Sequence, residues 1–136
     1  MTMHASSRSV DGSLRQEVVV RGRHRIATDE PAPLGGTDSG PAPHELLPAA
    51  LASCIGTTVL MYARTKDWPL RDVVVDVDYD HKSTPRAFSV GVRLVGPLDA
   101  EQAARLEKVA ESCPLRRALE AGFSFSERVE VAREAA

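Results

Sequence analysis

The segment from about residue 45 to residue 64 constrains the fold of this chain more than any other. Its spacing predicts a helix, but its apolar side chains lie almost all round the helix axis. They are Leu46, Leu47, Leu51, Ile55, Val59, Leu60 and Met61. Such a helix needs cover on every side, and a chain of 136 residues forms one compact domain that can scarcely wrap it completely. We therefore infer that a partner subunit supplies part of the cover.

The same apolar stretch is a poor candidate for a membrane span. It lacks the length and purity of a span, being interrupted by Pro48, Ser53, Thr57 and Thr58. Residues 1–14 lack the apolar run of a secretory signal, and we expect them to be a flexible N-terminal segment before a single domain over residues 15–136. A formal net charge of -2 gives no broad positive field for nucleic acid. These features predict a cytoplasmic protein without nucleic-acid or membrane partners.

The hydrophobic period changes several times along the chain. Strands are predicted over 15–20, 24–28, 73–79, 87–95 and 125–131, and helices over 45–64, 99–112 and 114–120. Residues 29–43 contain enough Pro and Gly to form a long loop. This order of elements is typical of an α+β fold and not of alternating βαβ units.

The chain has two cysteines, and their placement is its best clue to function. Cys54 lies inside the apolar helix, and Cys113 directly precedes Pro114 at a predicted helix start. Unpaired N–H groups and the helix dipole favour a thiolate at such a start, which makes Cys113 the better thiolate on local grounds. In a reducing compartment a cysteine pair is more often redox-active than structural. The spacing in sequence does not decide whether the two thiols meet.

Neither the acidic nor the metal-binding residue types form a recognisable metal motif. Asp76, Asp78 and Asp80 recur at even spacing and are interpreted as the wet face of a strand. The chain has no Cys-x-x-Cys or His-x-x-x-His spacing for zinc. We therefore predict no metal and no cofactor.

Two segments resemble the OsmC/Ohr family, the osmotically induced and organic-hydroperoxide-resistance proteins. They are GPAPHELL at 40–47 leading to ALASC at 50–54, and AESCPL at 110–115. With the predicted elements, the similarity covers roughly residues 15–132 and favours the OsmC-like branch. The resemblance implies antiparallel sheets wrapped around a long central helix that carries the first cysteine. It also implies an intertwined homodimer with active sites at the subunit interface.

The resemblance also implies a reaction. Cys54 would attack a small organic hydroperoxide, Cys113 would resolve the product as a disulfide, and a dithiol such as lipoamide would reduce that disulfide. Family peroxidases hold an activating arginine with a glutamate ten residues before the first cysteine, where this chain has His44. Glu45 is adjacent, and Arg25 or Arg23 is the candidate arginine.

These four supporting residues also have simpler interpretations. Glu45 can complement a helix N-terminus, His44 can be an exposed loop residue, and Arg23 and Arg25 can be solvated strand charges. The leading hypothesis is therefore a thiol peroxidase in oxidative stress defence that uses Cys54 and Cys113. The alternative is an OsmC-like binding or thiol-sensing stress protein without peroxidase turnover.

Overall fold

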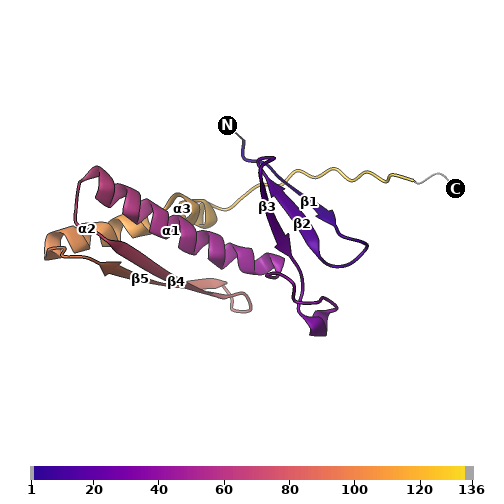
Figure 1. The fold of residues 1–136 in the computed structure, drawn as a ribbon, viewed down its shortest axis with the longest axis horizontal. Helices are drawn as coiled ribbons and strands as arrows, with labels where there is room; N and C mark the ends of the chain where they lie inside the picture. Colours follow the sequence, from indigo (N-terminus) through magenta and orange to yellow (C-terminus); the bar gives the residue numbers. More distant parts are fainter. Residues whose placement is uncertain (1, 134–136) are drawn as a thin grey trace.

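The computed structural model describes residues 2–133, which form two antiparallel sheets and three α-helices. The strands are β1 (Ala5–Ser9), β2 (Gln16–Val20), β3 (His24–Thr28), β4 (Asp72–Asp80) and β5 (Ala87–Val95). The helices are the short 3₁₀ segments η1 (Ala32–Leu34) and η2 (Pro43–Glu45) and the α-helices α1 (Leu46–Thr65), α2 (Ala100–Glu111) and α3 (Pro114–Ala121). The predicted α+β fold with antiparallel sheets and one long helix is confirmed (Figure 1).

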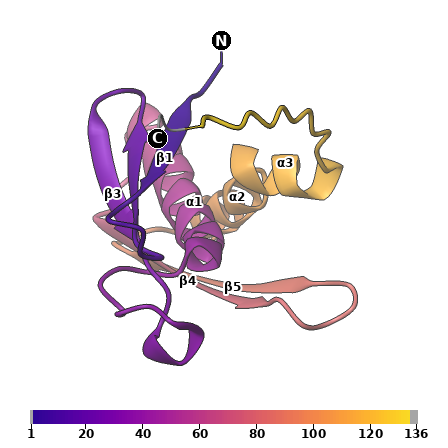
Figure 2. The same cartoon turned by 90° about the vertical axis from the view of Figure 1, so that its right-hand side faces the viewer.

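The N-terminal sheet has the order β1-β2-β3 and lies to one side of α1 (Figure 2). The predicted hairpin turns at Arg21 and Gly22, which both have positive φ. The flexible segment predicted for residues 1–14 is wrong at β1, where Ala5 pairs with Val20 and Ser9 with Gln16. All five β1 side chains are exposed, so backbone hydrogen bonds to β2 stabilise this strand. Its sequence therefore has no alternating apolar pattern from which a strand could be predicted.

The long helix α1 packs against β4 on one side and α2 on another. Its buried side chains recur every four residues and are Leu51, Ile55, Val59 and Ala63. Gly56 faces Val73 and Val75 of β4, and a Cβ there would lie 3.6 Å from a methyl group of Val75, an ordinary packing distance. The expectation that this stretch lacks the length and purity of a membrane span is wrong, because Pro43–Thr65 is long and apolar enough for one. The core helix of a soluble protein meets the same test.

The β4–β5 hairpin and α2 complete the body of the molecule. Asp72 pairs with Val95 and Asp80 with Ala87, in the register that the alternating pattern of each strand requires. The predicted capping box of α2 is present, because Asp99 accepts a hydrogen bond from the Gln102 amide and the Gln102 side chain accepts one from the Asp99 amide. The local sequence signals therefore place these elements to within about a residue.

The strand predicted over 125–131 is not formed. Within residues 2–133, the chain after α3 has no helix or strand and runs away from the body (Figure 1). Phe125 is 85% exposed and Val129 is 86% exposed. A strand needs a neighbouring strand for its backbone hydrogen bonds, and this single chain places none beside the segment.

A buried carboxylate organises the long loop before α1. Asp29 is 2% exposed. It accepts hydrogen bonds from the amides and hydroxyls of Thr37 and Ser39 and from the amide of Glu30. The Thr37 and Ser39 hydroxyls, followed by the Ser39 amide, hold the pKa of Asp29 far below its ordinary value, although burial opposes them. The loop is therefore fixed by polar contacts in place of an apolar core.

We predict that Asp29→Asn lowers the melting temperature at pH 7 and flattens its dependence on acid pH. Because the folded-state pKa of Asp29 is depressed, its contribution is complete above the unfolded-state pKa of about 3.9 and is lost as the pH falls toward the folded-state value. Thermal melts between about pH 2.5 and pH 7 measure this. The control is Asp76→Asn, on an exposed strand position, and equal pH profiles for both variants would contradict the assignment.

Candidate active site

The fold brings the two cysteines into contact. Cys54 lies on α1, and Cys113 occupies the position just before α3. Their Sγ atoms are 2.9 Å apart although 59 residues separate them in sequence. Both are free thiols, since the separation exceeds the roughly 2.05 Å of a disulfide bond. A small movement of either side chain would therefore close a disulfide.

Helix packing determines where Cys113 lies. α2 packs along α1 through Leu106, Val109 and Ala110, all of which belong to the buried core. The chain then turns at Cys113, which is fully buried, and Pro114 starts α3. Proline suits this first helical position because its missing N–H would have had no partner inside the helix. The core and the turn together hold the Cys113 thiol against α1.

The two thiols have opposite electrostatic environments. Burial raises the pKa of the Cys54 thiol, but the hydrogen bond from the Cys113 thiol and the contribution of the Leu115 amide outweigh burial and lower that pKa. Burial and the hydrogen bond to Cys54 raise the pKa of the Cys113 thiol. These directions favour Cys54 as the member of the pair that carries the thiolate, with Cys113 as its hydrogen-bond donor.

Local sequence reasoning considered only the effect of the start of α3 on Cys113, and the packing adds an effect on Cys54. The start of α3 was expected to help Cys113, which precedes it. The amide of Leu115, in the first turn of α3, acts to lower the pKa of Cys54 as well as that of Cys113, which the Arg116 amide also favours in its ionised form. The helix start thus supports the thiolate on the neighbouring helix, a relation that only the tertiary packing creates.

Glu45 and His44 have other contacts in this chain. The Glu45 carboxylate accepts a hydrogen bond from the Ala42 amide at 2.9 Å and so caps η2. The His44 ring lies 5.3 Å from the ring of Tyr79 and 5.6 Å from that of His81, measured between centroids. These contacts place both side chains at the N-terminal end of α1, away from the sulfur pair.

The two candidate arginines lie in the N-terminal sheet. Arg25 forms an ion pair with Glu17 across the β2–β3 ladder, and both side chains are largely exposed. Arg23 is exposed in the turn between these strands. Across residues 2–133, neither arginine forms a hydrogen bond with Cys54 or Cys113. A single chain therefore brings together the two thiols but none of the four supporting residues.

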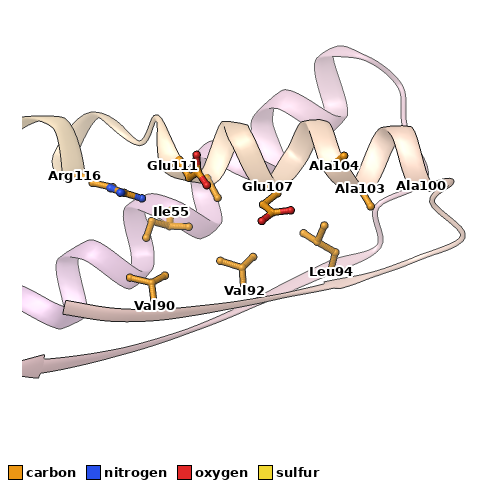
Figure 3. A pocket seen from close by; sticks show the side chains of 11 residues that line it. Ile55, Val90, Val92, Leu94, Ala100, Ala103, Ala104, Glu107, Glu111 and Arg116 are labelled. Carbon is orange, nitrogen blue, oxygen red and sulfur yellow. The ribbon is translucent and has the colours of Figure 1, made fainter.

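A cavity of about 650 Å³ lies between β5 and α2 (Figure 3), and neither cysteine is among the residues that line it. The apolar side chains Val90, Val92 and Leu94 point into it from the strand, and Ile55, the neighbour of Cys54, enters from α1. Arg116 lies at the end nearest α3 and is paired with Glu120 at 2.8 Å. Sequence reasoning identified these strand residues only as core, because periodicity marks a buried face but cannot show that it is incompletely filled.

Metal-ligand types do not gather elsewhere in the described chain. Among residues 2–133 no group of three or more His, Cys, Asp or Glu side chains has the arrangement to hold a metal ion.

Solved structures share this fold. A Psychrobacter arcticus protein named for osmotic stress induction and a detoxification response is 24% identical, with a TM-score of 0.70, and the match covers 86% of this chain and 87% of that one. An organic hydroperoxide resistance protein OsmC of Legionella pneumophila is 24% identical, with a TM-score of 0.58 and coverage of 86% and 88%. The organic hydroperoxide resistance protein OhrB of Bacillus subtilis is 24% identical, with a TM-score of 0.53 and coverage of 86% and 89%.

No curated protein matches the sequence. The family model for OsmC-like proteins matches residues 36–128, a span that includes both cysteines, the helix α1 and the β4–β5 hairpin. This span is more than half of the chain, which therefore belongs to the OsmC family.

Proposed function

We propose that this protein is a cytoplasmic thiol peroxidase that reduces organic hydroperoxides, with Cys54 as the nucleophile and Cys113 as the resolving thiol. The observation that carries the proposal is the 2.9 Å separation of the two sulfur atoms. The lowered pKa of Cys54 supports its assignment as nucleophile, because the thiolate is the reactive form. The printed names of the Legionella and Bacillus neighbours support hydroperoxide as the substrate class.

The reaction needs no metal for its balance. The Cys54 thiolate attacks the distal oxygen of the hydroperoxide, the O–O bond breaks, and an alkoxide leaves and takes a proton to become the alcohol. Cys54 is then a sulfenic acid. The Cys113 sulfur attacks it, forms the disulfide and releases water. A dithiol reductant of the lipoamide type returns both cysteines to thiols and is itself oxidised to a disulfide.

The cavity between β5 and α2, which Ile55 next to Cys54 helps to line, supports an organic substrate over hydrogen peroxide. Its walls are mostly apolar, with Val90, Val92 and Ile55 among the lining residues. An alkyl or aryl group would leave water on entering it. We expect the rate of reaction with cumene hydroperoxide to exceed the rate with hydrogen peroxide for this reason.

We also propose that the working form is a homodimer. α1 has an outward face that the chain leaves exposed, which consists of Ala50, Ser53, Thr57 and Met61. Met61 is 63% exposed, and Phe125 and Val129 after α3 are likewise uncovered. Small side chains on the helix face allow a second helix to approach closely. A partner subunit would cover this face and the C-terminal apolar residues together.

We predict that Thr57→Arg converts the dimer into a monomer, because a long charged side chain would have to be buried between the subunits. Light scattering coupled to size exclusion measures the mass against the 14.7 kDa of one chain. The control is Ser89→Arg, on the exposed face of β5. A wild-type protein with the mass of one chain would contradict the dimer.

A second candidate function is a stress protein that senses thiol oxidation or binds a ligand without turnover. The observation that favours it is the position of the four supporting residues, since Glu45 caps η2 and Arg25 pairs with Glu17. Without an activating pair, Cys54 would depend on local hydrogen bonds alone. Oxidation could then occur once without efficient recycling.

One experiment separates these functions. The reduced protein is mixed with excess cumene hydroperoxide, with and without dihydrolipoamide, and the remaining peroxide and free thiols are followed. Continued consumption that depends on the dithiol supports the peroxidase. One equivalent of consumption with loss of both thiols supports the sensor, and unchanged thiols support the binding protein, so either of these results would overturn the peroxidase proposal.

A further inference from the structure

Cys113 contacts the sulfur of Cys54 before any oxidation takes place. Its thiol donates a hydrogen bond across the 2.9 Å that separates the sulfur atoms. Cys113 is fully buried, so its proton has no competing water acceptor. A resolving thiol needs only to reach the sulfenic acid after the first step. The contact in the reduced chain keeps Cys113 ready for resolution, and it also places a thiol proton against the sulfur that must ionise first.

We infer that Cys113 is also an activating residue, which holds Cys54 as a thiolate by hydrogen bonding together with the Leu115 amide at the start of α3. The inference rests on the proposed peroxidase function and extends it to the first step of the reaction. Cys113 then acts twice in each cycle, first as donor and afterwards as nucleophile.

The surroundings of Cys54 support this assignment. Across residues 2–133 no charged side chain forms a hydrogen bond with either sulfur. The remaining donor is the Thr58 hydroxyl, but its single proton is directed to the carbonyl oxygen of Cys54 at 2.7 Å. A hydrogen bond to an ionised acceptor is about twice as strong as one between neutral groups. Within the described residues of one chain, the thiol and amide donors are thus the groups that favour the Cys54 thiolate.

The test compares two variants that both lack the resolving thiol. Cys113→Ser keeps a donor at this position, whereas Cys113→Ala removes it. Each variant has Cys54 as its one cysteine, so alkylation by iodoacetamide reports on that thiol alone. The alkylation rate is measured from about pH 5 to pH 10. This readout does not depend on peroxide turnover, so failure of the proposed function and failure of this inference are distinguishable.

We expect alkylation of Cys113→Ala at pH 7 to be roughly tenfold slower than that of Cys113→Ser, with its pH midpoint shifted upward. The rates at high pH should agree, because Cys54 is then fully ionised in both. The single-turnover rate with cumene hydroperoxide should show the same ratio. Equal pH midpoints in the two variants would overturn the inference, because a thiol that serves only in resolution leaves Cys54 unchanged.

A second pair of variants covers the case in which an alanine at the buried position prevents folding. Cys113→Thr and Cys113→Val have nearly the same shape and differ in whether they offer a hydroxyl donor. Circular dichroism confirms the helix content of each protein before alkylation. The same upward shift of the pH midpoint is expected in the valine variant relative to the threonine variant, and its absence overturns the inference.

Discussion

In Cys54→Ser, the consumption of cumene hydroperoxide should fall by roughly three orders of magnitude or more, to the rate without protein. A serine hydroxyl is not ionised near neutral pH, and its oxygen is a far weaker nucleophile toward peroxide than a thiolate. Colorimetric assay of the remaining hydroperoxide measures the loss. Cys113 remains in this variant, with a raised pKa and full burial, and we expect it to contribute no measurable turnover.

The matched control is Cys113→Ser, which should still react with hydroperoxide but should not turn over. This variant should consume one equivalent of hydroperoxide and then stop, leaving a sulfenic acid on Cys54 that dimedone labels. Prolonged exposure should oxidise that cysteine further, since no resolving thiol is present. Turnover that persists in Cys54→Ser, or that continues undiminished in Cys113→Ser, would contradict the assigned roles.

Leu106→Ala should destabilise the protein by about 3 kcal/mol and lower its melting temperature by roughly 10 °C. Leu106 is fully buried in the core that joins α2 to α1, and its removal leaves a cavity there. The same packing holds Cys113 against Cys54. Thermal and chemical denaturation measure the change in stability, and we also expect slower closure of the disulfide in this variant.

The control for this prediction is Leu34→Ala. Leu34 is 65% exposed in the loop before α1, so its truncation should change the free energy of unfolding by about 0.5 kcal/mol or less. If both variants lost equal stability, the α1–α2 packing would not be the main core of the molecule.

Most of the secondary structure could be predicted because its signals are local. β3 and β5 have the predicted bounds, and α2 has the predicted capping box at Asp99. The alternation of apolar and polar residues in strands, the apolar spacing of helices and the capping residues each involve only a few neighbouring positions in the sequence. β1 was not predicted, and the strand predicted over 125–131 does not form. In both segments the structure depends on whether another strand lies alongside, which the local residues do not show.

The candidate site could be predicted only in part. The motifs around Cys54 and Cys113 identified the residues, but their contact arises from the packing of α2 on α1. The reach of the Leu115 amide to Cys54 is likewise a tertiary relation. Asp29 was overlooked in the loop, since a carboxylate that accepts loop amides and hydroxyls has no periodic signature.

The supporting residues show the limit of transfer by motif. His44 stands at the family position of a glutamate, and in this chain it packs against the rings of Tyr79 and His81. Arg25 is paired within its own sheet. Sequence position alone could not reveal these contacts, because each depends on which strand end or loop lies opposite.

The most direct test of the account is the mass of the reduced protein after one equivalent of cumene hydroperoxide. Peptide mass spectrometry after alkylation should find Cys54 and Cys113 joined in one disulfide within the chain, with a loss of two hydrogen atoms and no added oxygen. Recovery of both cysteines as alkylated thiols, or of Cys54 carrying added oxygen beside an intact Cys113 thiol, would contradict it.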